Sequence, residues 1–292
     1  MRLGLSLPMF TADVRRPLAA AARAAAAGYE GVFAPDHLFP PGAPSRPSLE
    51  PYMVLAAVAA LHRGLRVGTL VTRASLRSAG TVAKQAASLD RMSGGAILGL
   101  GAGDAVSEPE HETYGIPFAP APERVAVLEE TVRALRSLFD GRSWGGGAHV
   151  PPIAGPLLPP ARPELWVGGR SEAVRAIAAR TADAWNGWAM DAEAFEAAAG
   201  DLRRYADGRT VTPTWGGIVL VGKDRDELDH LREERRARGL TTDTWQGTVG
   251  DLRSFAGRLE DAGCSWLIVL PVGGDDRIDL VAGALEAGNG GR

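Results

Sequence analysis

Short apolar runs alternate with longer helix-like segments along almost the whole chain, and this alternation constrains the fold more than any other feature. The apolar runs have the length of buried strands, and the segments between them carry apolar residues at helical spacing. The strand candidates are residues 3–7, 31–34, 65–71, 96–100, 164–168, 183–187, 213–221 and 265–270. The helix candidates are residues 13–27, 50–62, 80–91, 122–139, 171–181, 191–205, 224–238, 248–262 and 277–287. Eight strand-then-helix units predict a parallel sheet closed into a (β/α)₈ barrel, because doubly wound open sheets usually have fewer strands.

The length and continuity of the chain favour one domain. Its 292 residues are close to the roughly 250 that such a barrel takes. No break in composition and no internal repeat divides it, so a single domain over residues 1–292 is predicted. Residues 141–163 are rich in glycine and proline, and they are expected to form an irregular loop and the most mobile segment.

Composition excludes several classes of protein. The formal net charge of −3 gives no reason to expect a nucleic-acid partner. A single cysteine, Cys264, excludes an internal disulfide and a cysteine-based zinc site. No apolar stretch reaches the roughly 18 residues of a membrane span, and Pro8 interrupts the first apolar run too early for a secretory signal. A cytoplasmic protein without a membrane partner is therefore predicted.

The loops after the strands build the active sites of α/β barrels, and one of these loops holds Asp36 and His37. Histidine exchanges a proton near neutral pH, and the adjacent Asp36 carboxylate is a candidate to orient it. The alternative is that Asp36 only caps a turn and that His37 has no role. Both interpretations remain open from these residues alone.

Two glycine-rich junctions follow later strands. Gly99, Gly101 and Gly103 alternate up to Asp104, which suits close approach of a ligand to the backbone but does not match the dinucleotide-binding motif. The second junction, residues 168–171, places two glycines and a serine at the start of a helix. Successive N–H groups and the positive helix end there predict a phosphate site, although Ser171 also suits a plain helix cap.

Other polar clusters give weaker indications. Four acidic or histidine side chains follow Asp104, but they are expected in a loop interrupted by Pro109, so no metal site is predicted. They are Glu108, Glu110, His111 and Glu112. Trp185 and Trp188 either line a pocket or fill the top of the barrel. No Gly-x-Ser-x-Gly elbow is present, so a hydrolase nucleophile is not indicated.

At these junctions the sequence resembles the luciferase-like monooxygenase superfamily, especially its coenzyme F420-dependent branch, over nearly the whole chain. The matching segments are FAPDH at 33–37, VGTLVT at 67–72, AKQAASLDRMSGG at 83–95, LGLGAG at 98–103, YGIPF at 114–118, ER at 123–124, LWVGG at 165–169 and AARTADAWNG at 178–187. Their order and spacing are specific to the superfamily and less specific to the deazaflavin branch.

The resemblance implies a barrel without a long lid insertion that holds coenzyme F420, or alternatively FMN, in its mouth. It implies that His37 is an acid/base group, that Asp104 assists it, and that the Leu70–Val71 peptide bond is cis and supports the cofactor ring. It also implies phosphate binding by the backbone of residues 168–170. The cofactor-binding residues predicted in all are Asp36, Leu70, Val71, Gly101, Gly103, Gly168, Gly169, Arg170 and Ser171.

Two departures from the family pattern bear on function. Asp104 stands where many deazaflavin members have glutamate, and Pro41 stands where the sugar-phosphate dehydrogenases have tryptophan. Three functions follow: an F420-dependent oxidoreductase of a small organic substrate, an FMN-dependent monooxygenase served by a separate reductase, or a barrel that binds ligand without catalysis. His37 and Asp104 argue against the last. A homodimer is usual in the family and is expected.

Overall fold

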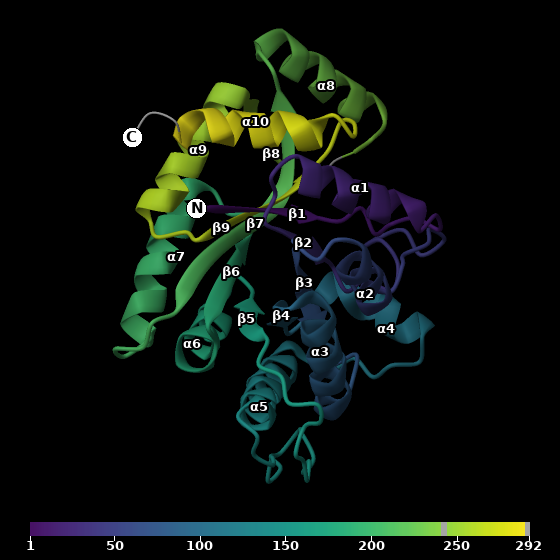
Figure 1. Ribbon diagram of the computed structural model, residues 1–292, viewed down its shortest axis with the longest axis vertical. Helices are drawn as coiled ribbons and strands as arrows, with labels where there is room; N and C mark the ends of the chain where they lie inside the picture. The colour runs from purple at the N-terminus through teal and green to yellow at the C-terminus, as the bar shows by residue number, and fades with distance from the viewer. Residues whose placement is uncertain (241–243, 290–292) are drawn as a thin grey trace.

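The computed structural model describes residues 1–240 and 244–289. Eight parallel strands hydrogen-bond in a closed ring, which confirms the predicted (β/α)₈ barrel (Figure 1). In ring order the strands are β1 (Arg2–Ser6), β2 (Gly31–Ala34), β3 (Arg66–Arg73), β4 (Ala96–Gly101), β5 (Glu164–Gly168), β6 (Ala184–Trp188), β7 (Thr212–Gly222) and β9 (Trp266–Pro271). Pairing of β9 with both β1 and β7 closes the ring.

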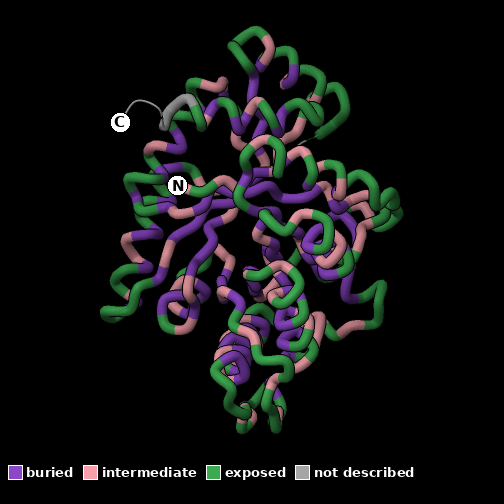
Figure 2. The backbone as a smooth tube through the Cα atoms, in the orientation of Figure 1, coloured by how far each residue is buried: buried purple, intermediate pink, exposed green. Residues whose placement is uncertain are grey.

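Helices surround the ring and bury their apolar faces against it (Figure 2). Their bounds are α1 (Arg15–Ala26), α2 (Pro51–Leu61), α3 (Ala79–Ser93), α5 (Ala121–Phe139), α6 (Glu172–Thr181), α7 (Ala192–Tyr205), α8 (Arg225–Ala237), α9 (Val249–Asp261) and α10 (Arg277–Asn289). Side-chain caps start several of them. Ser78, Ser171 and Asp191 each accept a backbone N–H from the first turn of the helix that follows, which satisfies donors that the helix leaves unpaired.

Aromatic side chains fill the barrel interior below the ends of the strands. Phe33 stacks on Trp166 with ring centroids 5.5 Å apart, and Trp266 meets both rings edge-on. Gly4 makes room for this layer, since a Cβ there would lie 2.7 Å from Phe33 Cε2. The barrel is therefore solid in its middle, and only its two ends are accessible to a ligand.

A ninth strand, β8 (Trp245–Thr248), lies outside the ring and was not predicted. It pairs only with the last residues of the long strand β7, from Val219 to Gly222. The segment of β8 has no apolar run, and Gly247 is its one buried residue, so the pattern held no strand signal. Strand β8 and helix α8 extend to one side of the barrel, at the top of Figure 1.

The loop at 141–163 is irregular, as predicted, but it is attached to the barrel at several points. Trp144 and Ile153 form an isolated antiparallel bridge. The carboxylate of Glu130 on α5 accepts N–H groups from Ala148, His149 and Val150 at 2.8–2.9 Å. Its mobility stays a prediction.

No helix within residues 1–240 and 244–289 is long and apolar enough to cross a membrane. The single domain predicted over 1–292 includes residues 241–243 and 290–292, which lie outside the described residues. That extent stays a prediction, as does the cytoplasmic location.

Candidate active site

Strand β3 is irregular near its carboxyl end, where the site residues begin. Its register against β4 shifts between Thr69 and Thr72. The Leu70–Val71 peptide bond inside this irregularity is cis, as the resemblance predicted. Thr69 Oγ1 donates to the carbonyl of Gly99 on β4 at 3.0 Å and fixes the strand before the shift.

The side chain of Val71 packs over the glycines of the next two strands. A Cβ on Gly101 would lie 2.5 Å from Val71 Cγ2, and Cβ atoms on Gly99 and Gly168 would lie 3.2 and 2.7 Å from Val71 Cγ1. These are closer than carbon atoms pack. Gly101 and Gly168 thus provide the space for Val71, a role that the sequence interpretation of a direct ligand approach did not include.

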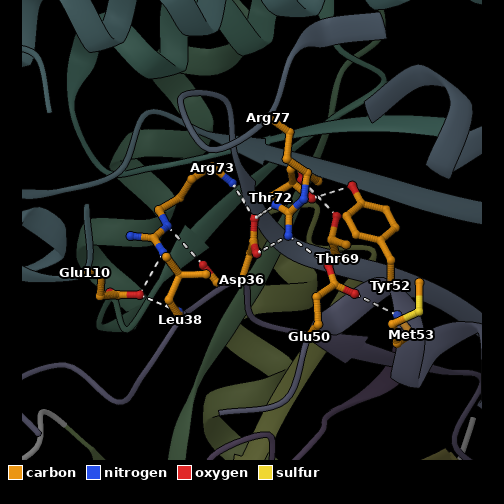
Figure 3. A network of polar contacts seen from close by, with 11 residues as sticks. Asp36, Leu38, Glu50, Tyr52, Met53, Thr69, Thr72, Arg73, Arg77 and Glu110 are labelled. Atoms are coloured by element: carbon orange, nitrogen blue, oxygen red, sulfur yellow. Dashed lines mark hydrogen bonds and ion pairs between the residues drawn. The ribbon is translucent and has the colours of Figure 1, made fainter. Parts of the chain in front are cut away.

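The carboxylate of Asp36 is buried and faces arginines, not His37. Its Oδ2 accepts the backbone N–H of Arg73, and both its oxygens accept from the guanidinium of Arg77 at 2.5 and 3.0 Å (Figure 3). Arg73 Nε in turn donates to the Asp36 carbonyl at 3.0 Å. Asp36 therefore joins β2 to the end of β3, and the idea that it orients His37 is wrong.

Glu110 is the carboxylate that contacts His37. The segment expected as a loop forms a short helix, α4 (Glu108–Thr113), which follows a 3₁₀ turn, η1 (Ala105–Ser107), and proline is compatible with a helix at its first turn. Glu110 is fully buried, with Oε1 2.8 Å from His37 Nδ1. Its Oε2 accepts from Leu38 N and Arg73 Nη2 at 2.5 and 2.8 Å (Figure 3).

Electrostatics favour the ionised form of Glu110. Burial alone would raise its pKa, but the hydrogen bond and charge of His37, the Leu38 N–H and the positive charge of Arg73 together lower the pKa below its ordinary value. In the sequence, Glu110 was considered only as a metal ligand and was set aside because a loop containing Pro109 was expected there. It is 73 residues from His37, so no local spacing connects the two.

The neighbouring His111 faces elsewhere. Its Nδ1 lies 2.9 Å from the carbonyl of Pro117, its ring meets Phe118 edge-on, and burial lowers its pKa. Among the residues that the structure describes, no three histidine, cysteine, aspartate or glutamate side chains are placed to hold a metal ion.

Asp104 lies exposed in the loop after β4, directly before the 3₁₀ turn η1 that leads to α4. Its Oδ1 accepts the hydroxyl of Ser107 at 3.1 Å. Gly103 before it has φ of +73°, a conformation that favours glycine. No hydrogen bond joins Asp104 to His37 in the described part of the chain, so its assistance to His37 stays a proposal.

The turn from β5 into α6 offers fewer N–H groups than its two glycines indicated. The Gly169 N–H donates to the carbonyl of Asn186 at 3.1 Å, and the Ser171 hydroxyl accepts from Val174 N as a helix cap. The N–H groups of Glu172 and Ala173, in the first turn of α6, remain as donors, because the first N–H groups of a helix have no partner within it. Arg175 holds the turn by donating to the Arg170 carbonyl at 2.5 Å.

The two tryptophans at the end of β6 lie on opposite sides of the strand. Trp185 is buried outside the barrel, stacks on Phe195 of α7 and donates to the Gly169 carbonyl at 2.8 Å. Trp188 packs with the interior cluster against Gly216. Only Trp188 thus belongs to the barrel mouth.

The residues present fit a flat aromatic cofactor with a phosphate-bearing tail. The ends of β2, β3, β4 and β5 are adjacent in the ring. They supply the His37 imidazole, whose Nε2 has no hydrogen-bond partner among the described residues, the apolar pair Leu70–Val71, and the open start of α6. A helix start with free N–H groups suits a phosphate, and an apolar side chain suits one face of a ring.

Comparison with known proteins identifies the family. The profile of luciferase-like monooxygenases matches residues 1–263, and the chain belongs to this family. A phthiodiolone/phenolphthiodiolone dimycocerosates ketoreductase of Mycobacterium tuberculosis (strain ATCC 25618 / H37Rv) is 30% identical over 217 residues, 67% of this chain and 55% of the relative. The chain thus spans about half the length of the curated relatives it matches.

Solved structures show the same fold. An F420-dependent secondary alcohol dehydrogenase in complex with an F420-acetone adduct superposes with a TM-score of 0.81 at 17% identity, over 98% of both chains. An EDTA monooxygenase from Chelativorans sp. BNC1 superposes with a TM-score of 0.80 at 16% identity, over 98% of this chain and 93% of the other. The family match and the solved structures thus agree on a luciferase-like (β/α)₈ barrel.

The packing of Val71 on Gly101 predicts a non-additive pair of mutations. Gly101→Ala should lower the free energy of unfolding by about 1–3 kcal/mol, the usual cost of overpacking. In a Val71→Ala background the same change should cost much less, because the opposing methyl group is gone. Chemical denaturation of the four proteins followed by circular dichroism gives the coupling. Gly257→Ala, in α9 with open space around it, is the control and should be neutral or stabilising. Equal costs of Gly101→Ala in both backgrounds would contradict the packing.

Proposed function

We propose that the protein is a coenzyme F420-dependent oxidoreductase that transfers hydride between the deazaflavin and a small alcohol or carbonyl substrate. The observation that carries the proposal is the His37–Glu110 contact, which engages one ring nitrogen of His37 and leaves Nε2 without a hydrogen-bond partner in the described residues. A quarter of the His37 side chain is exposed. The site thus has a proton-transfer group held in place at the barrel mouth.

The chain would hold the cofactor with groups of two kinds. The N–H groups at the start of α6 would bind the phosphate, and the Leu70–Val71 segment would support one face of the ring. When bound, the cofactor supplies the hydride chemistry by accepting or returning a hydride ion. Gly103 lets the loop after β4 turn beside the site, and Asp104 in that loop is proposed to orient the substrate or to assist with the proton.

His37 would handle the proton that accompanies the hydride. When the carbinol carbon gives up its hydrogen with both bonding electrons, the hydroxyl proton passes to His37 Nε2 and a carbonyl product forms. In the reverse direction the imidazolium returns that proton to the oxygen as the carbonyl carbon receives hydride. A positioned acid or base of this kind contributes about 10²–10⁴-fold to the rate.

The comparisons support deazaflavin chemistry without excluding flavin chemistry. An F420-dependent tetrahydromethanopterin reductase from Methanopyrus kandleri, with a TM-score of 0.78, stands beside the alcohol dehydrogenase. The EDTA monooxygenase, at a TM-score of 0.80, keeps an FMN-dependent monooxygenase as the second candidate. A barrel that binds ligand without catalysis is disfavoured by the buried Glu110 beside His37, because burying a charge is costly and needs compensation.

Cofactor titration separates the two candidate enzymes. Purified apo-protein titrated with F420 and with FMN should quench tryptophan fluorescence with higher affinity for F420. Gly169→Val should weaken that binding at least about tenfold, because a Cβ there would lie 2.9 Å from Val174 Cγ1 and disturb the helix start. Gly80→Ala, which meets nothing closer than 3.9 Å, is the matched control. Preference for FMN would replace the first candidate with the second, and an unchanged affinity of Gly169→Val would remove the proposed phosphate site.

Replacing His37 tests the proton transfer. His37→Ala should lower turnover of a secondary alcohol by about 10²–10⁴-fold and change F420 affinity by no more than a few-fold. Turnover is followed by cofactor absorbance and affinity by fluorescence. His62→Ala, at the end of α2, is the control. Full turnover in His37→Ala would show that the histidine is only a wall of the pocket.

We further propose a homodimer that meets through helix α2. The helix carries no charged residue, and the side chains of Met53 and Leu61 are 66% and 62% exposed. A helix that is apolar all round is normally covered on both faces, and a second copy presents an equally uncharged face. Sedimentation should give a dimer, and Met53→Lys should give a monomer. Leu158→Lys, also 62% exposed but in the loop at 141–163, should stay dimeric. A wild-type monomer would overturn the proposal.

A further inference from the structure

The two carboxylate oxygens of Glu110 have different donors. Oε2 receives the backbone N–H of Leu38 at 2.5 Å and Nη2 of Arg73 at 2.8 Å. Both of these groups can only donate, because a peptide nitrogen and a guanidinium carry their protons at every pH at which the protein is folded. Among the residues that the structure describes, Oε1 has one hydrogen-bond partner, Nδ1 of His37 at 2.8 Å, and this is a nitrogen that can be either donor or acceptor.

An ionised carboxylate can only accept hydrogen bonds, so it determines which ring nitrogen of the neutral histidine carries the proton. Glu110 is completely buried, and Arg73 beside it is nearly so, with 4% of its side chain exposed. The arginine charge compensates the buried carboxylate, and the Leu38 N–H and Arg73 Nη2 both donate to it, which favours its ionised form. Two charged neighbours of this pair, Asp36 and Arg77, neutralise each other through two hydrogen bonds.

We propose that Glu110 is a positioning residue that fixes neutral His37 as the Nδ1–H tautomer and so presents an unprotonated Nε2 at the barrel mouth. The opposite tautomer would place two lone pairs, on Nδ1 and on Oε1, against each other at hydrogen-bond distance inside the protein. The same contact holds the plane of the imidazole, because Glu110 itself is fixed by Leu38 and Arg73.

The consequence for turnover depends on the function proposed above. With the proton on Nδ1, neutral His37 is ready to accept the hydroxyl proton of an alcohol. With the proton on Nε2, that nitrogen has no lone pair to accept the hydroxyl proton, and the ring must first change tautomer. Glu110 thereby makes the neutral imidazole a base at the nitrogen that faces the substrate.

Glu110→Gln makes a sharp test because it keeps the size of the side chain and removes one acceptor. The amide has one oxygen and one NH₂ group. The two obligate donors, Leu38 N–H and Arg73 Nη2, require the oxygen on their side, so the NH₂ group must face His37. Nδ1 then becomes the acceptor, and the proton moves to Nε2. We expect the substitution to invert the tautomer of His37.

Nitrogen-15 NMR of the five histidines in apo-protein measures the tautomer of His37 directly. Spectra recorded at alkaline pH, where the histidine signals no longer change with pH, distinguish Nδ1–H from Nε2–H rings. The His37 signals are assigned by their loss in His37→Asn. Wild type should show Nδ1–H, and Glu110→Gln should show Nε2–H. Glu112→Gln, exposed on the same helix, should match wild type.

The wild-type spectrum decides the proposal even if Glu110→Gln fails to fold, since an Nε2–H tautomer in wild type overturns it. An Nδ1–H tautomer in folded Glu110→Gln overturns it as well. Turnover of a secondary alcohol by Glu110→Gln should fall about 10²-fold or more, with F420 affinity unchanged. If the tautomers are as expected but no alcohol is oxidised, the proposed function fails and the positioning role of Glu110 stands.

Discussion

Three charged side chains, Asp36, Arg73 and Glu110, are buried together where the ends of β2 and β3 meet α4, with the partly buried Arg77 beside them, and the arrangement of the site depends on their mutual compensation. Each buried charge alone would cost several kcal/mol. Asp36 is paired with Arg77, and Glu110 with Arg73, while Arg73 also donates to the Asp36 carbonyl. Because the contacts of Asp36 and Leu38 join the loop after β2 to Arg73 and to Glu110, the loop is held against β3 and α4. His37 receives its position from this network.

The barrel itself was predictable because its pattern is local and repeated. An apolar run indicates a buried strand, and apolar residues at helical spacing indicate a helix that covers it. A chain with eight such units has few possible folds other than the barrel. The elements missed were those without that pattern. Strand β8 has one buried residue, and the short helix α4 begins with Glu108 and Pro109, which suggested a loop.

The candidate site was predictable in part. The residues of its loops could be named from motifs, and the cis Leu70–Val71 bond followed from the resemblance alone. The partners of those residues could not be named, because they depend on contacts between distant segments. Asp36 is next to His37 in the sequence, whereas Glu110 is next to His37 in the folded structure. Only the folded chain shows that His37 contacts the second. The same holds for Gly169, whose N–H is taken by Asn186 on the next strand.

Barrel strands usually both close the hydrogen-bonded ring and carry the loops that shape its mouth. Strand β8 lies outside the ring, so it can shape the mouth without taking part in ring closure. The hydrogen-bonded ring closes through β7 and β9, so α8 and β8 form an appendage on a finished barrel. Its length can change at a cost that grows only with the logarithm of the added residues, while the ring keeps its register. Since the appendage grows from the carboxyl end of β7, such changes remodel the rim on one side of the mouth and leave untouched the opposite side, where β2 to β5 carry His37 and the start of α6. The rim beside β7 can therefore change its shape while the segments that carry His37 and the start of α6 keep theirs.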